Sequence, residues 1–308
     1  MSKRKKTAAP VGVVDIGSNS VRLVVYDLSA AKPKMTMQAK ANCGLAKGMR
    51  HDHRRLNPDG VKKALRTLRR FRALLDKHQV EKVAAIGTAA MRQTRHTPQG
   101  RKFHAQAERA LGHKISVVSG PREARLGAQG VTNSWPKANG ICGDFGGGSL
   151  ELTRVVNGEN RQAVSLPLGS LTLLTETGGD RQAAAALIRR RLRRLSWLQD
   201  NGETFYTIGG SWRTLAHVLR GHGKAQPMHG HKLAAPKARP KLKKLAAAPV
   251  ARFSKMGKKI RHRASMLPVA ALVLSELMDI IQPQRIVFSG HGVREGIVAE
   301  MKHQRKAP

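Results

Sequence analysis

The chain has 308 residues, of which 40% are hydrophobic, and its 57 Lys and Arg against 19 Asp and Glu give a formal net charge of +38. A chain of this length can bury a sizeable core and predicts roughly two domains. The composition excludes a disulfide framework, because Cys43 and Cys142 are the only cysteines, and we expect free thiols and a cytoplasmic location.

No membrane span is expected. Asp15 interrupts the first apolar run, and the run "LPVAALVL" at 267–274 is shorter than a bilayer requires. We therefore expect a globular protein without a membrane partner.

The positive charge is unevenly distributed. Residues 204–275 contain 15 Lys and Arg and no Asp or Glu, and eleven of these cations lie at 237–263. Such an excess repels itself in a compact chain and predicts a polyanionic partner. Only 4% of residues are aromatic, which is poor provision for base stacking, and no zinc-finger, RNA-recognition or basic-zipper pattern occurs. We expect no specific nucleic acid as the partner.

In chain order, the first segment is "VVDIGSNSVRLVVYD" at 13–27, two apolar runs joined by Gly17 and Asn19, which is typical of a hairpin. A helix is predicted from the cap "NPDG" at 57–60, then a strand entering a turn at 82–93, a helix at 101–112, a strand at 114–120 and a helix from Pro121. These elements predict a βα-rich first domain.

The second half restarts a β pattern at "ICGDFGGGSLELTRVVNGE". A helix is expected at 181–200, with apolar residues on one side and arginines on the other. A strand, glycine turn and helix follow at 206–218 and again at 284–303. The histidines of "GHGKAQPMHGH", His222, His229 and His231, have no nearby acid or cysteine and are interpreted as loop residues rather than a metal site.

The opening hairpin occurs twice. "DIGSNSVRL" aligns without a gap with "DFGGGSLEL", which pairs Asp15 with Asp144 and Gly17 with Gly146. A single glycine hairpin is compatible with an ordinary turn, whereas this repeat predicts duplicated domains on either side of a cleft.

The repeated loops have the chemistry of a phosphate site. Glycines leave backbone N–H groups exposed to phosphate oxygens, and Asp15 and Asp144 are hard oxygen ligands that suit Mg²⁺. "IGGS" at 208–211 supplies a third loop. The candidate phosphate-binding residues are Gly17, Ser18, Asn19, Ser20, Arg22, Gly146, Gly147, Gly148, Ser149, Gly209, Gly210 and Ser211.

The chain resembles the exopolyphosphatases and guanosine pentaphosphate phosphohydrolases of the actin and sugar-kinase superfamily. The resemblance rests on seven ordered motifs: "DIGSNSVRL", "GTAAMRQ", "VVSGPREARLGAQGV", "DFGGGSLEL", "SLPLGS", "IGGSWRTLA" and "GHGVREG". It implies an α/β protein with two ribonuclease-H-like domains, of the actin-like ATPase type, flanking a central cleft. The expected domains are 1–126 with about 296–308, and 127–295 with a basic helical segment at 181–275.

The resemblance also implies residue roles. Glu123 occupies the position of the family's catalytic base, and Arg92 matches an arginine beside the phosphates. Without the resemblance, Glu123 would be a first-turn helix acid and Arg92 a surface residue. The chain departs from the family pattern at Arg122, at "SGHGVREG" and at "RASM" (263–266). Because it lacks the extra helical domains of longer relatives, we expect a minimal two-domain form.

Two classes of function follow. The first is a Mg²⁺-dependent exopolyphosphatase that releases orthophosphate, with guanosine pentaphosphate as the alternative substrate. The second is a non-catalytic module that binds polyanions or nucleic acid. The joint presence of Asp15, Glu123 and Asp144 favours the enzyme. For the oligomeric state, we expect a homodimer. A polyphosphate track is predicted at Lys241, Lys243, Lys244, Lys258 and Lys259.

Overall fold

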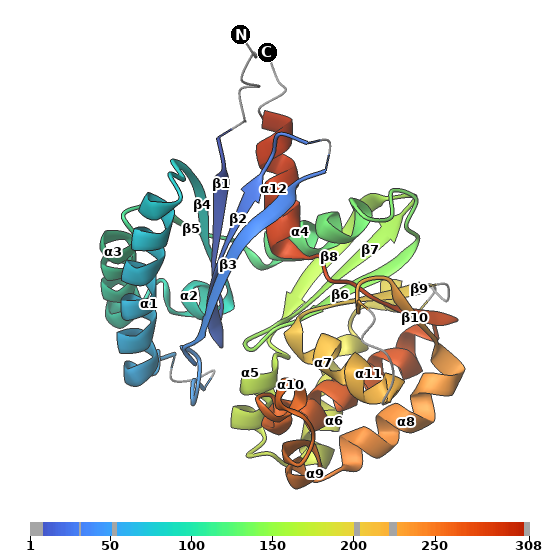
Figure 1. Cartoon of the computed structure of the whole chain (residues 1–308). Coiled ribbons are helices and arrows are strands. Elements are labelled where there is room, and N and C mark those ends of the chain that lie inside the picture. The colour runs from blue at the N-terminus through green and yellow to red at the C-terminus, as the bar shows by residue number, and fades with distance from the viewer. Residues whose placement is uncertain (1–8, 31, 51–53, 200–203, 222–226, 305–308) are drawn as a thin grey trace. The chain divides into compact units, whose positions relative to one another are not determined.

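The structure is a computed structural model, and it describes residues 9–304 apart from 31, 51–53, 200–203, 222–226 and the side chain of Lys259. The chain divides into two compact units, Met1–Ser119 with Ile297–Pro308 and Gly120–Gly296 (Figure 1). The sequence places a boundary at 126/127, which falls inside a helix of the second unit.

The first unit is built on a five-stranded mixed sheet. Its elements are β1 (Val11–Ile16), β2 (Ser20–Asp27), β3 (Lys34–Asn42), α1 (Pro58–Lys77), β4 (Lys82–Gly87), α2 (Ala89–Thr94), α3 (Pro98–Leu111), β5 (Ile115–Val117) and most of α12 (Val293–Gln304). The strand order is β3-β2-β1-β4-β5, with β1 antiparallel to β2 and parallel to β4.

Helix α1 begins and packs as its sequence predicts. The Asn57 side chain caps it by accepting from the Gly60 N–H at 2.8 Å. Its buried side includes Leu68, Phe71 and Leu75. Gly12 of β1 allows the buried side of α1 to approach the sheet closely, because a Cβ at Gly12 would lie 2.8 Å from Leu75 Cδ2.

The second unit is built on a six-stranded mixed sheet, ordered β10-β11-β9-β6-β7-β8. Its elements are α4 (Gly120–Thr132), β6 (Gly140–Phe145), β7 (Leu150–Val156), β8 (Glu159–Leu166), α5 (Ser170–Glu176), α6 (Arg181–Leu192), a 3-10 helix (Ser196–Leu198), β9 (Thr204–Ile208), α7 (Gly210–Arg220), β10 (His231–Ala234), α8 (Ala235–Ala247), α9 (Val250–Ser254), α10 (Lys258–Arg261), a second 3-10 helix (Ala264–Met266), α11 (Leu267–Ile281) and β11 (Arg285–Phe288).

The two faces of this sheet carry different cores. Ile141 and Phe205 face the larger core, which α6, α7, α8 and α11 complete. Their strand neighbours Cys142 and Tyr206 face a smaller core with Val131 of α4. This division follows from the alternation of side chains along each strand. Cys43 of the first unit and Cys142 are both buried free thiols, as expected.

The repeated hairpin has the same register in both units. Asp15 lies opposite Arg22 in β1–β2, and Asp144 lies opposite Glu151 in β6–β7. The Gly17 N–H donates to Ser20 O at 3.0 Å, and the equivalent bond from Gly146 to Ser149 has the same length. The gapless repeat in the sequence is therefore a structural repeat.

One expectation for the second unit is wrong: the helix expected at 181–200 ends at Leu192. Its arginines are mostly exposed, although Arg191 Nη2 pairs with Glu176 Oε2 at 3.1 Å and Arg189 Nη1 with Glu276 Oε1 at 3.7 Å. The apolar run at 267–274 belongs to a longer helical segment, Ala264–Ile281, which by length and composition alone could cross a membrane. It is 61% buried, and α11 lies in the larger core.

Trp212, in the motif "IGGSWRTLA", has a structural role. It is fully buried, it stacks on Phe145 at a centroid distance of 5.2 Å, and its Nε1–H donates to Ala270 O at 2.9 Å. Gly143 of β6 leaves room for it, because a Cβ there would lie 3.2 Å from the indole. The indole thus joins β6, α7 and α11.

We expect Trp212→Ala to lower the free energy of unfolding of the second unit by about 3–5 kcal/mol, since it leaves a cavity and an unpaired carbonyl. Chemical denaturation measures the loss. Val250→Ala is the control, because Val250 is 43% exposed and its truncation should change stability by less than about 0.5 kcal/mol. A loss below about 1 kcal/mol for Trp212→Ala would contradict the role assigned to the indole.

Candidate active site

The expected site residues divide between the two units. The first unit holds Asp15, the loop 17–20, Arg22 and Arg92. The second holds Glu123, Asp144, the turn 146–149 and the loop 209–211. Each unit thus contains one copy of the repeated hairpin with its aspartate.

In the first unit, backbone hydrogen bonds hold the loop that follows β1. Asn19 O accepts from the N–H groups of Cys43 and Gly44, both at 2.9 Å, and Ser18 O accepts from Ala46 at 2.9 Å. The Ser18 side chain is 4% exposed, and its Oγ has no hydrogen-bond partner among the described residues. A buried hydroxyl without a partner is costly, so this atom is suited to a polar ligand.

Arg92 lies on α2, which begins directly after β4. Its Nη1 donates to Val118 O at 3.2 Å, which holds the side chain across the end of β5. The structure has a short helix where the sequence predicts a turn after β4. The hydrogen bond to Val118 fixes Arg92 within the first unit.

In the second unit, the Asp144 carboxylate lies in a cradle of three glycines. A Cβ at Gly209 would lie 3.0 Å from Asp144 Oδ1, and one at Gly292 or Gly127 would lie 3.7 or 3.8 Å from Oδ2. Gly209 also has a φ of +103°, which disfavours other residues. Glycine at these three positions leaves space around the carboxylate for a small ligand.

Glu123 lies on the same side of α4 as Gly127, one helical turn earlier. This spacing directs it toward the side of the helix that approaches Asp144. The Glu123 side chain is buried, at 8% exposed.

Glu151, which the sequence analysis did not single out, completes a group of three carboxylates. It is 3% exposed, and its Oε1 accepts from Ser165 Oγ at 2.6 Å. Burial, together with the nearby charges of Glu123 and Asp144, raises the pKa of Glu151 well above its usual range. The sequence could have indicated Glu151, because the register of the repeated hairpin places it side by side with Asp144.

The turn 146–149 offers fewer free amides than expected. The Gly146 N–H closes the turn onto Ser149 O, and the carbonyl of Gly147 accepts from Leu171 at 2.8 Å. Among the described residues, the N–H groups of Gly147 and Gly148 have no acceptor. These two amides, rather than all of those in the turn, are the ones without a protein acceptor.

The third loop adds two arginines that the sequence analysis also missed. Gly209 precedes α7, and Ser211 in the first turn is buried. The Arg263 guanidinium packs against Gly210, and Arg213 Nη1 donates to Gly290 O at 2.8 Å. Burial lowers the pKa of Arg263, and the charge of Arg213 lowers it further. Two close, partly buried cations at a helix N-terminus favour a bound anion.

The expected polyphosphate track is only partly open. Lys241 and Lys244 are exposed on α8, and Lys258 is exposed on α10. Lys243 Nζ pairs with Asp279 Oδ2 of α11 at 3.6 Å. The acid-free segment 204–275 therefore obtains a counter-charge from the part of α11 that follows it. The side chain of Lys259 lies outside the described residues.

The histidines lie in separate environments. The ring centroids of His229 and His291 lie 4.2 Å apart. His231 lies in β10 and pairs with Phe288 of β11, so it is not a loop residue. His222 lies outside the described residues. Within the described part of the chain, no three His, Cys, Asp or Glu side chains form a preformed metal cage.

The donors of the second unit nevertheless fit Mg²⁺. This ion is usually held by one or two carboxylates, with waters and substrate phosphates completing its octahedron, so a three-ligand protein cage is not required. The glycine cradle leaves room at Asp144, and a cation would offset the repulsion among the three carboxylates. Asp144 and Glu151 are the residues of this unit best suited to hold it.

Comparison with known proteins gives a consistent result. The sequence model of the Ppx/GppA phosphatase family matches residues 24–305. The guanosine-5'-triphosphate,3'-diphosphate pyrophosphatase of Aeromonas salmonicida is 26% identical over 296 residues, and that of Vibrio cholerae is 25% identical over 298 residues. These alignments cover 92% and 94% of this chain, and the chain spans 58% of the length of each relative.

Solved structures share the fold. The Aquifex aeolicus Ppx/GppA family member has a TM-score of 0.80 at 23% identity, covering 97% of this chain and 99% of its own. An exopolyphosphatase from Cytophaga hutchinsonii has a TM-score of 0.83 at 22% identity, covering 96% and 98%. The chain shares its α/β fold, with two mixed sheets, with these structures, so the expected α/β fold class is confirmed.

We expect Glu151→Gln to raise the free energy of unfolding of the chelator-treated protein at pH 7–8. The pKa of Glu151 is raised on folding, so its stabilising contribution is fully present below the unfolded pKa, about 4.3, and is lost as pH rises through the folded pKa. The advantage of the variant should therefore shrink toward pH 4.

Urea denaturation across this pH range measures the difference. Glu159→Gln is the control, because Glu159 is exposed and its ion pair with Arg161 lies at the surface. A Glu151→Gln variant whose difference from the wild type is the same at pH 4 and pH 8 would show that Glu151 is not strained by its neighbours.

Proposed function

The chain belongs to the Ppx/GppA phosphatase family, and we propose that it is a Mg²⁺-dependent exopolyphosphatase that removes terminal orthophosphate from inorganic polyphosphate. The observation that carries the proposal is the group of Glu123, Asp144 and Glu151 beside the glycine cradle. Carboxylates next to open amides and arginines suit a phosphoanhydride, which is itself anionic and binds Mg²⁺.

In the proposed reaction, Glu123 accepts the proton of a water whose oxygen attacks the terminal phosphorus. The bond from that phosphorus to the bridging oxygen breaks, and the shortened chain leaves with the bridging oxygen. When Mg²⁺ is bound, it offsets negative charge on the phosphate oxygens. Burial of Glu123 in the second unit keeps bulk water from competing for its proton.

Binding of the phosphates falls to groups around the carboxylates. The N–H groups of Gly147 and Gly148 are open to phosphate oxygens, and Arg213 and Arg263 supply positive charge at the start of α7. Guanidinium groups hold phosphate oxygens in pairs, which fixes orientation as well as charge. The roles of Asp15, Arg22 and Arg92 in the first unit stay predictions from the sequence.

Polyphosphate is favoured over guanosine pentaphosphate by charge. The net charge of +38 and the 15 cations at 204–275 exceed what one terminal phosphate requires, whereas a long polyanion can engage many of them. The exposed lysines of α8 and α10 are proposed to hold the chain between cleavages, which would make hydrolysis processive. Because Lys243 pairs with Asp279, it contributes less than Lys241 and Lys244.

Guanosine pentaphosphate remains the second candidate. The curated relatives from Aeromonas and Vibrio carry that activity in their names. A binding module without turnover is the third, and the presence of three grouped carboxylates in the second unit speaks against it. A homodimer stays a prediction.

We expect Glu123→Gln to reduce phosphate release from long-chain polyphosphate by about 10²–10⁴-fold, because the amide keeps the shape but accepts no proton. Binding of polyphosphate should persist. The measurement is orthophosphate release with Mg²⁺ and with chelator, beside Glu159→Gln, which should keep wild-type rates.

The same assay on guanosine pentaphosphate separates the candidates. The proposal expects a higher kcat/KM on polyphosphate. A higher value on guanosine pentaphosphate would favour the second candidate, and binding without release of phosphate from either substrate would favour the binding module. Near-normal turnover by Glu123→Gln would show that Glu123 is not the general base.

A further inference from the structure

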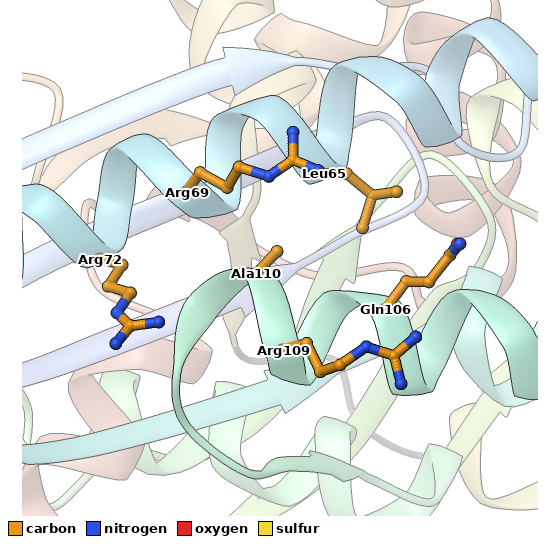
Figure 2. Close-up of a pocket in the computed structure, with 6 residues that line it drawn as sticks. All are labelled: Leu65, Arg69, Arg72, Gln106, Arg109 and Ala110. Carbon is orange, nitrogen blue, oxygen red and sulfur yellow. The ribbon is translucent and has the colours of Figure 1, made fainter.

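A groove of about 420 Å³ lies between α1 and α3 of the first unit, outside the residues assigned to hydrolysis (Figure 2). It is lined by Leu65, Arg69, Arg72, Gln106, Arg109 and Ala110. Three of these six side chains are arginines, and none is acidic.

Helical spacing brings the lining together. Leu65, Arg69 and Arg72 follow one another at i, i+4 and i+7 on α1, and Gln106 is followed by Arg109 at i+3 on α3. The floor is formed by Leu65, which is half-buried, and Ala110, which is buried. Figure 2 shows the long polar side chains arranged around the space between the two helices.

Arg72 is positioned by a specific backbone feature. Helix α3 ends at Gly112, whose φ is +78°, and a Cβ there would lie 3.1 Å from Arg72 Nε. The absence of that Cβ lets the guanidinium lie over the carboxyl end of α3, where the helix dipole favours a cation. The groove thus holds its cations through the fold of the two helices.

The guanidinium groups have no partner within the protein. Among the described residues, Arg69, Arg72 and Arg109 form no hydrogen bond and no ion pair. The acid nearest in sequence, Glu108, is engaged elsewhere: its Oε1 accepts from the Ile115 N–H at 2.9 Å, and its Oε2 lies 3.7 Å from Lys114 Nζ. Three like charges around one groove repel one another, and an anion with several charges would relieve this repulsion.

The chemistry of the lining selects among polyanions. Guanidinium forks match phosphate oxygens, and the Gln106 amide adds a donor. No aromatic side chain lines the groove, so it offers no surface on which a nucleic-acid base could stack. A chain of phosphates without bases fits this lining best.

We propose that the α1–α3 groove is a second binding site for inorganic polyphosphate, one that holds the substrate without cleaving it. The identity of the ligand rests on the proposed function. A long chain that is held at a second point rebinds its first point at a high effective concentration, so the groove raises affinity for long chains. Tripolyphosphate is too short to gain from two sites at once.

The test compares two triple variants of equal charge in the full chain, each carrying Glu123→Gln so that polyphosphate is not consumed. The groove variant is Arg69→Gln, Arg72→Gln, Arg109→Gln. The control variant is Lys63→Gln, Arg66→Gln, Arg70→Gln, which removes three exposed cations from the adjacent stripe of α1. Affinity for long-chain polyphosphate, tripolyphosphate and single-stranded DNA is measured against salt.

We expect the groove variant to bind long-chain polyphosphate about 10- to 100-fold more weakly than the parent, and the slope of log affinity against log salt to fall by up to about three. The control variant should stay within about threefold of the parent, and tripolyphosphate affinity should change equally in both variants. Thermal unfolding verifies that each variant folds, and Arg109→Gln alone, at an exposed position, should give an intermediate loss.

Equal losses in the two triple variants would overturn the inference, because they would show only the effect of net charge. A groove variant that loses as much affinity for DNA as for polyphosphate would also overturn it, since the site would then select no phosphate chain. Failure of the proposed function is distinguishable: the protein would release no phosphate from polyphosphate, whereas binding by the Glu123→Gln parent would still report on the groove.

Discussion

The candidate site depends on the crowding of three carboxylates in the second unit. Burial of Glu151 from β7, and then the charges of Glu123 from α4 and Asp144 from β6, raise the pKa of Glu151. The register of β6 and β7 places Asp144 beside Glu151, and Gly209 lets the backbone approach Asp144 closely, because a Cβ there would lie 3.0 Å from Asp144 Oδ1. Such an arrangement opposes stability in the absence of a cation, and it is useful when a cation and an anionic substrate bind.

The duplicated hairpin explains how one backbone serves two kinds of chemistry. Both copies place an aspartate before the same turn, closed by the same 3.0 Å bond. At the position opposite that aspartate, the first copy has Arg22 and the second has Glu151. The two hairpins therefore differ in charge at this position, with a cation in the first and an acid in the second, although their registers are identical.

Local patterns predicted most of the fold, and long-range contacts decided what was missed. The hairpins, the Asn57 cap and the glycine loops depend on neighbours in sequence, so they could be predicted. Helix α6 ends at Leu192 without a Gly or Pro nearby, so no local signal in the sequence marks that end. Glu151 and Arg263 matter because of partners that are distant in sequence, which no periodicity reveals. The gapless repeat was the one signal that placed Glu151 beside Asp144.

The most direct test of the carboxylate site is the unfolding temperature of the wild type and of Asp144→Asn across a Mg²⁺ titration at pH 8, with KCl series of matched ionic strength. A ligand that binds the native state raises this temperature by mass action. The account predicts a rise with Mg²⁺ beyond the KCl series in the wild type and a much smaller rise in Asp144→Asn. An equal rise in both proteins would contradict it, because Asp144 would then have no part in holding the ion.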